Sequence, residues 1–434
     1  MTEPTSGPSG PSSRPGGRRR RSASVGFIVV TLAIDALGFG LVVPIMPLLI
    51  QHLAGVTPSA ASFWMGLTLT GFAIMQFACA PIIGGLSDRF GRRPVLLLSL
   101  AGIGTSYLML AWAPSLAWLM LGRCIAGATA ANASTATAYI ADVTPPHQRA
   151  ARFGLIGASF GLGFIIGPAV GGLLGVYGLR VPFLAAAALA GCNLLYGIFV
   201  LPESLSPDLR RRFEWKRATP AGSLRALALS PNLARLAVAW GCSWFALGAL
   251  QTSFVLANEI RFGWDTRHNG MALAVAGLGS ALVQGLLVRR VIGALGERRA
   301  AMTGAVITGA GYVLIALAPV GWVVMAALVL QAAGAFTGPA VQGMVSAIVG
   351  SDRQGETQGA LTSVQGLTAI VSPIVAGLVF AHFAEPNAAV HLPGAPFLIS
   401  ALAFLVALVA VAGVRLPPAL ADEEPAAAGV EAGR

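Results

Sequence analysis

Two charged residues stand inside long apolar stretches of this sequence. Asp35 lies about ten residues into the run 26–50, and Arg123 lies within LGRCIAGATAANAS. A charge at the centre of a membrane-spanning helix costs roughly 2.5–3.5 kcal/mol on insertion scales, so each must face a cavity or a partner. A partly desolvated carboxylate can load and release a proton near neutral pH. We therefore expect Asp35 to be a proton-titrating group that faces a central cavity, the alternative being a structural ion pair.

Arg123 keeps its charge at every accessible pH, so a carboxylate, a group of carbonyls or water must serve it. Small residues follow it at Ala126, Gly127 and Ala130, which permits close helix contact. We hypothesise that Arg123 attracts Asp35 when Asp35 is charged and that protonation weakens this attraction. A purely structural arginine at a helix crossing is the alternative.

Uncharged polar residues also interrupt the apolar runs, and some of them should line a cavity while others hold helices together. These residues are Gln76, Asn132, Asn193, Gln251, Gln284, Gln331, Gln342 and Gln365. Our candidates for contact with a bound small molecule are Gln76, Asn132 and Gln284.

The composition is that of a membrane protein. The chain has 434 residues, of which 56% are hydrophobic and 10% charged, whereas soluble proteins carry about 25% charged residues. Its four cysteines are far apart in apolar runs and its five histidines are scattered, so no metal site is predicted. No nucleophile–base arrangement, HExxH or nucleotide-binding motif supports an enzyme or an ATP-driven pump, and no cofactor is expected.

Twelve apolar runs are long enough to cross a bilayer, which takes about 20 residues. They are 26–50, 64–86, 95–113, 116–140, 154–176, 181–201, 233–256, 270–293, 301–318, 322–348, 359–381 and 395–414. The predicted fold is an all-α membrane protein with two six-helix halves. The expected divisions are a disordered tail 1–24, halves 25–202 and 233–415, a linker 203–232 and a tail 416–434.

The distribution of basic residues predicts the topology. With both termini in the cytoplasm, 24 of the 28 Lys and Arg residues fall on the inside, as the positive-inside rule requires. The net charge of +11 therefore reflects membrane anchoring and not nucleic-acid binding. We expect a multi-pass protein of the bacterial inner membrane, with a monomer as the working expectation.

A short charged turn, GGLSDRFGRRP (84–94), connects the second and third runs. RRVIGALGERR (289–299) occupies the corresponding place in the second half but lacks the aspartate. We predict that the arginines fix topology and that Asp88 is a conformational latch, pairing with an arginine or a facing helix N-terminus. The gating residues predicted in this turn are Gly84, Asp88, Arg89, Gly91 and Arg92. Asp142, farther along, is expected to pair with Arg149 or Arg152.

The fifth run, GASFGLGFIIGPAVGGLLG (157–175), is too rich in glycine for helix propensity to explain. Glycines spaced by four residues flatten one helix face, and Pro168 permits a bend. We expect this helix to slide or rock between the halves, with a static dimer face as the alternative. The residues concerned are Gly163, Gly167, Pro168, Gly171 and Gly172.

These motifs resemble the signatures of proton-coupled drug antiporters of the major facilitator superfamily. Residues 84–94 resemble its first signature, Arg123 with Gly127 its second, and 163–173 the antiporter signature. DALGFGLVVPIMPLL (35–49), SDRFGRRPVLLLSL (87–100), GASFGLGFIIGP (157–168) and RFGW (261–264) are similar to the twelve-helix tetracycline efflux antiporters. The resemblance implies export of a drug, as a cation–drug complex in the tetracycline case, in exchange for protons, with the binding site between the halves.

Three positions depart from that pattern. The resemblance places an acidic residue, a histidine and a carboxylate where this chain has Ser106, Ser280 and Thr308. Proton coupling through Asp35 is therefore a safer expectation than tetracycline itself. The expected function is export of a hydrophobic or amphipathic drug, energised by the proton gradient. Export of an endogenous metabolite or sugar is the alternative, and a non-transporting receptor has little soluble chain with which to signal.

Overall fold

The computed structural model describes residues 16–130, 132–144, 146–205, 208, 210, 230–349 and 354–415, which form helices joined by short connections. The first half contains α1 (Gly16–Val42), α2 (Met46–Ala54), α3 (Pro58–Phe90), α4 (Arg92–Ala111), α5 (Leu116–Thr129), α6 (Asn132–Val143), α7 (Pro146–Gly175) and α8 (Val181–Val200). The second half contains α10 (Pro231–Phe262), α11 (Thr266–Leu282), the π-helical segment η3 (Val283–Leu287), α12 (Val288–Leu317), α13 (Gly321–Ala333), α14 (Thr337–Ile348), α15 (Gln354–Phe383) and α16 (Ala395–Ala412).

Each of the twelve predicted apolar runs coincides with helical structure, and the prediction of an all-helical membrane fold is confirmed. Within the described residues, eight helical segments are long and apolar enough to cross a membrane, or nine if the bent pair α1 and α2 counts as one span. This number is smaller than twelve because Thr266–Leu317 is continuous through η3 and counts once. The apolar helices Leu116–Thr129 and Gly161–Gly175 are also too short to count.

Three breaks in the helices have identifiable causes. The first run bends by 45° between α1 and α2, where Pro44 cannot continue the hydrogen-bond ladder. The fourth run is divided at Ala130 between α5 and α6. In α12 the chain turns at Gly296, whose φ of 74° and ψ of 161° suit glycine alone.

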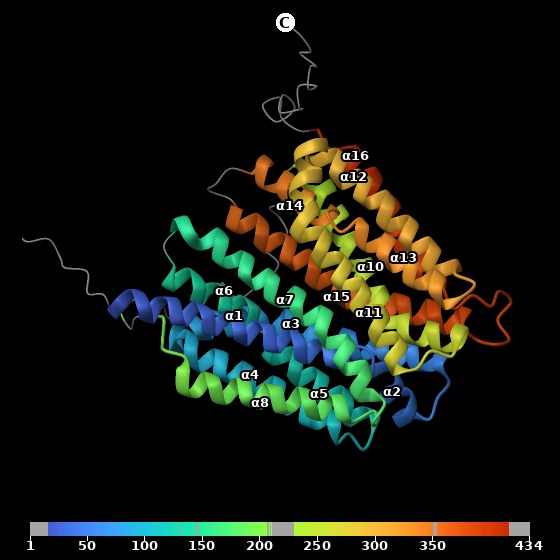
Figure 1. Cartoon of the computed structure of the whole chain (residues 1–434), viewed down its shortest axis with the longest axis horizontal. Coiled ribbons are helices and arrows are strands. Elements are labelled where there is room, and N and C mark those ends of the chain that lie inside the picture. The colour runs from blue at the N-terminus through green and yellow to red at the C-terminus, as the bar shows by residue number, and fades with distance from the viewer. Residues whose placement is uncertain are drawn as a thin grey trace, which may run out of the picture.

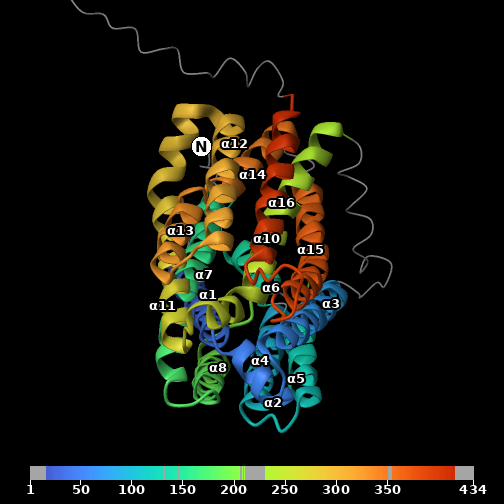
Figure 2. The ribbon, with the colours of Figure 1, turned by 90° about the vertical axis from the view of Figure 1, so that its right-hand side faces the viewer.

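The two halves form a V in Figure 1, with the first half in blue to green and the second in yellow to red. We call the end that carries Arg89–Arg93 and Arg289–Arg299 the arginine-rich end, and the other end the opposite end. The halves meet toward the opposite end and diverge toward the arginine-rich end. Figure 2 shows α11 beside α7 along one side of the junction and α15 beside α3 along the other.

Close backbone contacts hold the halves together near the opposite end. A Cβ atom added to Gly66 of α3 would overlap the carbonyl oxygen of Pro373 in α15, and one added to Gly172 of α7 would lie 2.9 Å from Cα of Gly270 in α11. At the start of α3, Ser59 Oγ donates a hydrogen bond of 2.8 Å to Glu385 Oε1 in the second half. Only residues without a Cβ permit such an approach, so the opposite end is closed in this structure.

Candidate functional site

Asp35 is held inside the first half. Asn193 of α8, which is fully buried, donates from Nδ2 to Asp35 Oδ1 at 3.2 Å and to the carbonyl oxygen of Thr31 at 3.1 Å. Tyr107 of α4 lies within electrostatic range of Asp35, and its hydroxyl would lie 3.3 Å from a Cβ on Gly38. Asn193 therefore orients this oxygen of Asp35, and the orientation of the carboxylate toward the central cavity stays a prediction.

Arg123 lies deep in the protein and is only 4% exposed. Its Cζ atom lies 4.4 Å from the ring centroid of Phe72, which places the guanidinium over the aromatic face. Its Nε atom is inaccessible to water and has no hydrogen-bond partner among the described residues. Tyr107 lies within electrostatic range of Arg123 as well as of Asp35.

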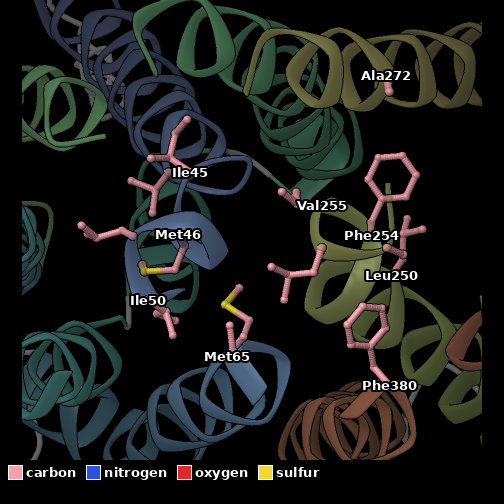
Figure 3. Packing of buried hydrophobic residues seen from close by; sticks show 14 of the residues in the cluster. Ile45, Met46, Ile50, Met65, Leu250, Phe254, Val255, Ala272 and Phe380 are labelled. Atoms are coloured by element: carbon pink, nitrogen blue, oxygen red, sulfur yellow. The ribbon is translucent and has the colours of Figure 1, made fainter. Parts of the chain in front are cut away.

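A small pocket lies between the halves beside Arg123. Its lining comes from α1, the bend after it, α2, α3, α5 and α10, and consists of Phe39, Val42, Val43, Met46, Met65, Leu69, Arg123 and Gln251. Figure 3 shows Met46 and Met65 of the first half facing Leu250, Phe254 and Val255 of the second. The cavity measures only about 20 Å³, so in this state it has no room for a drug-sized molecule. Methionine side chains adapt to irregular shapes, so the lining can rearrange.

The three candidates for small-molecule contact have different surroundings. Gln76 donates from Nε2 to the carbonyl oxygen of Ala130 at 3.3 Å, at the break between α5 and α6. It therefore satisfies a backbone group that the broken helix leaves unpaired. Gln284 is exposed and lies in the π-helical segment η3, a geometry frequent at functional sites. Asn132 lies outside the residues whose side chains are described. Gln251, which sequence reasoning did not select, lines the pocket.

The three positions that depart from the family pattern are occupied by small hydroxyl residues, and the buried Ser106 Oγ has no hydrogen-bond partner among the described residues. Ser106 is 1% exposed and lies next to Tyr107 on α4. Thr308 of α12 is 4% exposed, and its hydroxyl donates to the carbonyl oxygen of Gln331 in α13 at 3.4 Å. Ser280 lies near the end of α11. Among the described residues, no group of three or more His, Cys, Asp and Glu side chains could hold a metal ion.

The turn predicted at 84–94 is shorter than expected. Helix α3 continues to Phe90, so only Gly91, with a φ of 109°, separates it from α4. Asp88, in the last turn of α3, pairs across Gly91 with the first residue of α4: Asp88 Oδ1 lies 2.6 Å from Arg92 Nη1. Arg89 lies over the ring of Phe90, and the surroundings of Gly84 are open.

Arg92 joins three parts of the first half. Its Nε atom lies 3.2 Å from Asp142 Oδ2 in α6, so Arg92 is one partner of Asp142. Arg149 lies outside the residues whose side chains are described, so the pairing of Asp142 with Arg149 or Arg152 stays a prediction. Glu203, which follows α8, accepts hydrogen bonds from the backbone N–H groups of Arg92 at 2.8 Å and Arg93 at 3.2 Å. Glu203 thus caps α4, a role that sequence reasoning missed because the two positions are 111 residues apart.

The glycines of α7 face two different helices. Gly163, Gly167 and Gly171 lie against α1 of their own half, where a Cβ on Gly167 would come within 2.6 Å of Cα of Gly40. The expectation that this face lies between the halves is therefore wrong for these three glycines, since a four-residue spacing keeps them on one stripe that meets α1. Gly172 follows one position later and faces α11 of the second half, as does the carbonyl oxygen of Pro168.

Comparison with known proteins agrees with this architecture. The family model of the major facilitator superfamily matches residues 28–294 and 262–432. The chain is 38% identical over 384 residues to the class C tetracycline resistance protein of Escherichia coli, covering 88% of this chain and 95% of that protein. It is 28% identical to multidrug resistance protein 2 of Bacillus subtilis, covering 82% and 88% of the two chains.

A solved structure is also similar. The human organic anion transporter MFSD10 (TETRAN) superposes with a TM-score of 0.67 at 26% identity, covering 92% of this chain and all of that one. The helical halves, the signature turn at Gly91 and the extent of these matches lead to one conclusion. The chain belongs to the major facilitator superfamily and is a multi-pass membrane transporter of small molecules, not an enzyme.

Proposed function

We propose that this transporter exports a hydrophobic or amphipathic drug in exchange for protons, with tetracycline-like molecules as the first candidates. The observation that carries the proposal is Asp35, a carboxylate within a spanning helix that is oriented by Asn193 and lies beside Tyr107. Carboxylates retained at membrane depth serve proton relays in transporters. Support for a drug comes from the similarity to a tetracycline resistance protein and to a multidrug resistance protein.

In the proposed cycle, a proton on Asp35 enters from outside and drug leaves from inside, while one half rocks against the other. The arginine-rich end is cytoplasmic, as are both termini, in a bacterial inner membrane. The structure then corresponds to a state closed toward the outside. Arg123 responds to the charge of Asp35 across Tyr107. An Arg123→Ala variant in which the pH dependence of transport stays unchanged would exclude this coupling.

In the proposed cycle the substrate binds between the halves, where Met46 and Met65 offer adaptable apolar surface and Gln251 offers a hydrogen-bonding amide. The cavity of about 20 Å³ must widen to admit it. Export of an endogenous metabolite remains the second candidate. It is favoured by Ser106, Ser280 and Thr308, which stand in place of the polar groups of the tetracycline exporters.

A substrate panel tests this function. Inside-out vesicles containing the transporter would be assayed for uptake of tetracycline with a divalent cation, other amphipathic drugs and small metabolites, with and without an imposed proton gradient. We expect drug uptake that requires the gradient and stops when an uncoupler is added. Uptake of metabolites alone would select the alternative, and uptake of drug that ignores the gradient would exclude proton exchange.

A further inference from the structure

Besides Asp35 in the first half, a carboxylate of the second half, Glu259, lies where the two halves meet. Hydropathy alone did not identify it. The seventh apolar run was expected to end at residue 256, but α10 continues to Phe262 and places Glu259 one turn before the end of the helix. This position is at the opposite end, and the side chain of Gln51 from α2 of the first half lies beside the Glu259 carboxylate. Glu259 therefore belongs to the closed junction between the halves.

One oxygen of this carboxylate is isolated. Glu259 Oε2 is inaccessible to water and has no hydrogen-bond partner within the described part of the chain. Burial of an ionised carboxylate oxygen without a donor is costly, whereas a proton removes the charge and turns the group into a hydrogen-bond donor. Gln51 fits either state, because its amide carries both a donor and an acceptor.

No charged group in the described residues compensates Glu259. Arg261, two positions later, turns away and donates to the carbonyl oxygens of Ile315 and Ala318. The helices that pack against α10 are α2, α3, α14, α15 and α16. Their described titratable and charged side chains are His52, Cys79, Asp88, Arg89 and His382. The two histidines are exposed, and the other three residues lie in the part of α3 nearer the arginine-rich end. None of these groups interacts with the Glu259 carboxylate. Its environment is set by partial burial and by the side chain of Gln51.

Glu385 provides a contrast at the same end. It also belongs to the second half and also contacts the first, but it is exposed and its Oε1 atom accepts the 2.8 Å hydrogen bond from Ser59 Oγ. Ser59 lies in the first turn of α3, whose N-terminus favours a negative charge. Glu385 is thus satisfied as an anion when the junction closes, whereas Oε2 of Glu259 has no donor within the described residues.

We infer that Glu259 is a second proton-binding site, occupied when the opposite end is closed and emptied when that end opens to water. Acid on that side then favours closure, because the closed state binds one proton more than the open state. This inference rests on the proposed exchange of drug for protons: an outside proton drives the empty transporter back to the state that accepts drug from inside. It also gives the second half a titratable group although Ser280 and Thr308 replace the expected ones.

A labelling experiment tests the inference without any transported substrate. Cys79, Cys124, Cys192 and Cys242 are replaced by alanine, Asp35→Asn removes the other proton site, and Ser62→Cys places a reporter in α3 where the closed junction buries it completely. The rate of reaction with a polar maleimide is measured in nanodiscs between pH 5 and 8. Each rate is divided by the rate of the unfolded protein at the same pH.

We expect labelling to slow as the pH falls, by up to about tenfold per pH unit for one proton. Glu259→Gln should label slowly at every pH, and Glu259→Met, a second neutral side chain, should do the same if the glutamine variant does not fold. The control Glu385→Gln should retain the pH dependence. A Glu259→Gln or Glu259→Met protein with the wild-type pH dependence, or a wild-type junction that ignores pH, overturns the inference whether or not drug is exported.

Discussion

The two corresponding turns at the arginine-rich end each contain a glycine with a positive φ, but their charged side chains make different contacts. Gly91 separates α3 from α4 with a φ of 109°, and Gly296 turns the chain within α12 with a φ of 74°. In the first turn, the Glu203 carboxylate accepts hydrogen bonds from the backbone N–H groups of Arg92 and Arg93 and so caps α4. In the second, Glu297 follows the glycine directly, and its carboxylate lies half-buried against Gly343 of α14.

In this chain the two turns share their backbone geometry but not their charged contacts. The first turn brings Asp88, Arg92, Asp142 and Glu203 into one network within the first half. In the second, Arg298 donates to the carbonyl oxygen of Ala412, and burial raises the pKa of the Glu297 carboxyl above its ordinary value. Neither set of contacts joins the two halves, which fits an arginine-rich end that is open in this structure.

Replacing Gly91 or Gly296 with alanine should give the largest difference in stability between the two turns. Both positions have backbone conformations that cost about 1–3 kcal/mol for other residues. At Gly91, an added Cβ would also overlap the Glu203 carboxylate, whereas nothing lies within 4 Å at Gly296. We expect Gly91→Ala to lower the thermal midpoint in detergent more than Gly296→Ala, the matched control. Equal losses would mean that Glu203 does not contribute to the first turn.

Neutralising Glu203 and neutralising Glu297 should change the stability of the folded protein in opposite directions at pH 7. Glu203→Gln weakens a cap at a helix N-terminus and should cost about 0.3–1 kcal/mol. Because the pKa of Glu297 is raised in the folded protein, its contribution to stability is fully present below the ordinary glutamate pKa and is lost as pH rises through the raised pKa. Glu297→Gln should therefore leave stability equal or higher at pH 7, and the difference should vanish in acid. Thermal unfolding at pH 4.5 and 7 measures both, and a Glu297→Gln protein that is less stable at pH 7 contradicts the assignment.

Asp88→Asn should have the smallest effect on stability but a visible effect on transport. Its carboxylate is 46% exposed and pairs with Arg92 in the same turn, so it is free to exchange partners when the arginine-rich ends approach. We predict lower turnover with near-normal substrate affinity, measured as the maximal rate and half-saturating concentration of uptake into vesicles. Intact turnover with a large loss of affinity would reject the latch.

Most of the fold could be predicted from hydropathy, because each long apolar run must form a helix in a bilayer. The bend after Val42 was also predictable, since Pro44 lacks the N–H that a helix needs. The end of α3 was not, because SDRF (87–90) is polar and hydropathy gives no reason for the helix to continue through it to Phe90.

The site was predictable only in part. A charge inside an apolar run identifies Asp35 and Arg123 without any structure. Their neighbours Asn193 and Tyr107 come from α8 and α4, and no local pattern indicates which polar residue will meet which charge. Glu259 was missed for another reason: it lies three residues beyond the predicted end of its apolar run, and its importance comes from α2 of the other half.

The central claim is that Asp35 exchanges protons for substrate. The most direct measurement compares Asp35→Asn with the wild type in vesicles, for any substrate found in the panel, under an imposed proton gradient and in exchange without a gradient. The account predicts that Asp35→Asn folds, still exchanges labelled for unlabelled substrate, and loses accumulation driven by the gradient. Full proton-driven accumulation in the Asp35→Asn protein would contradict it.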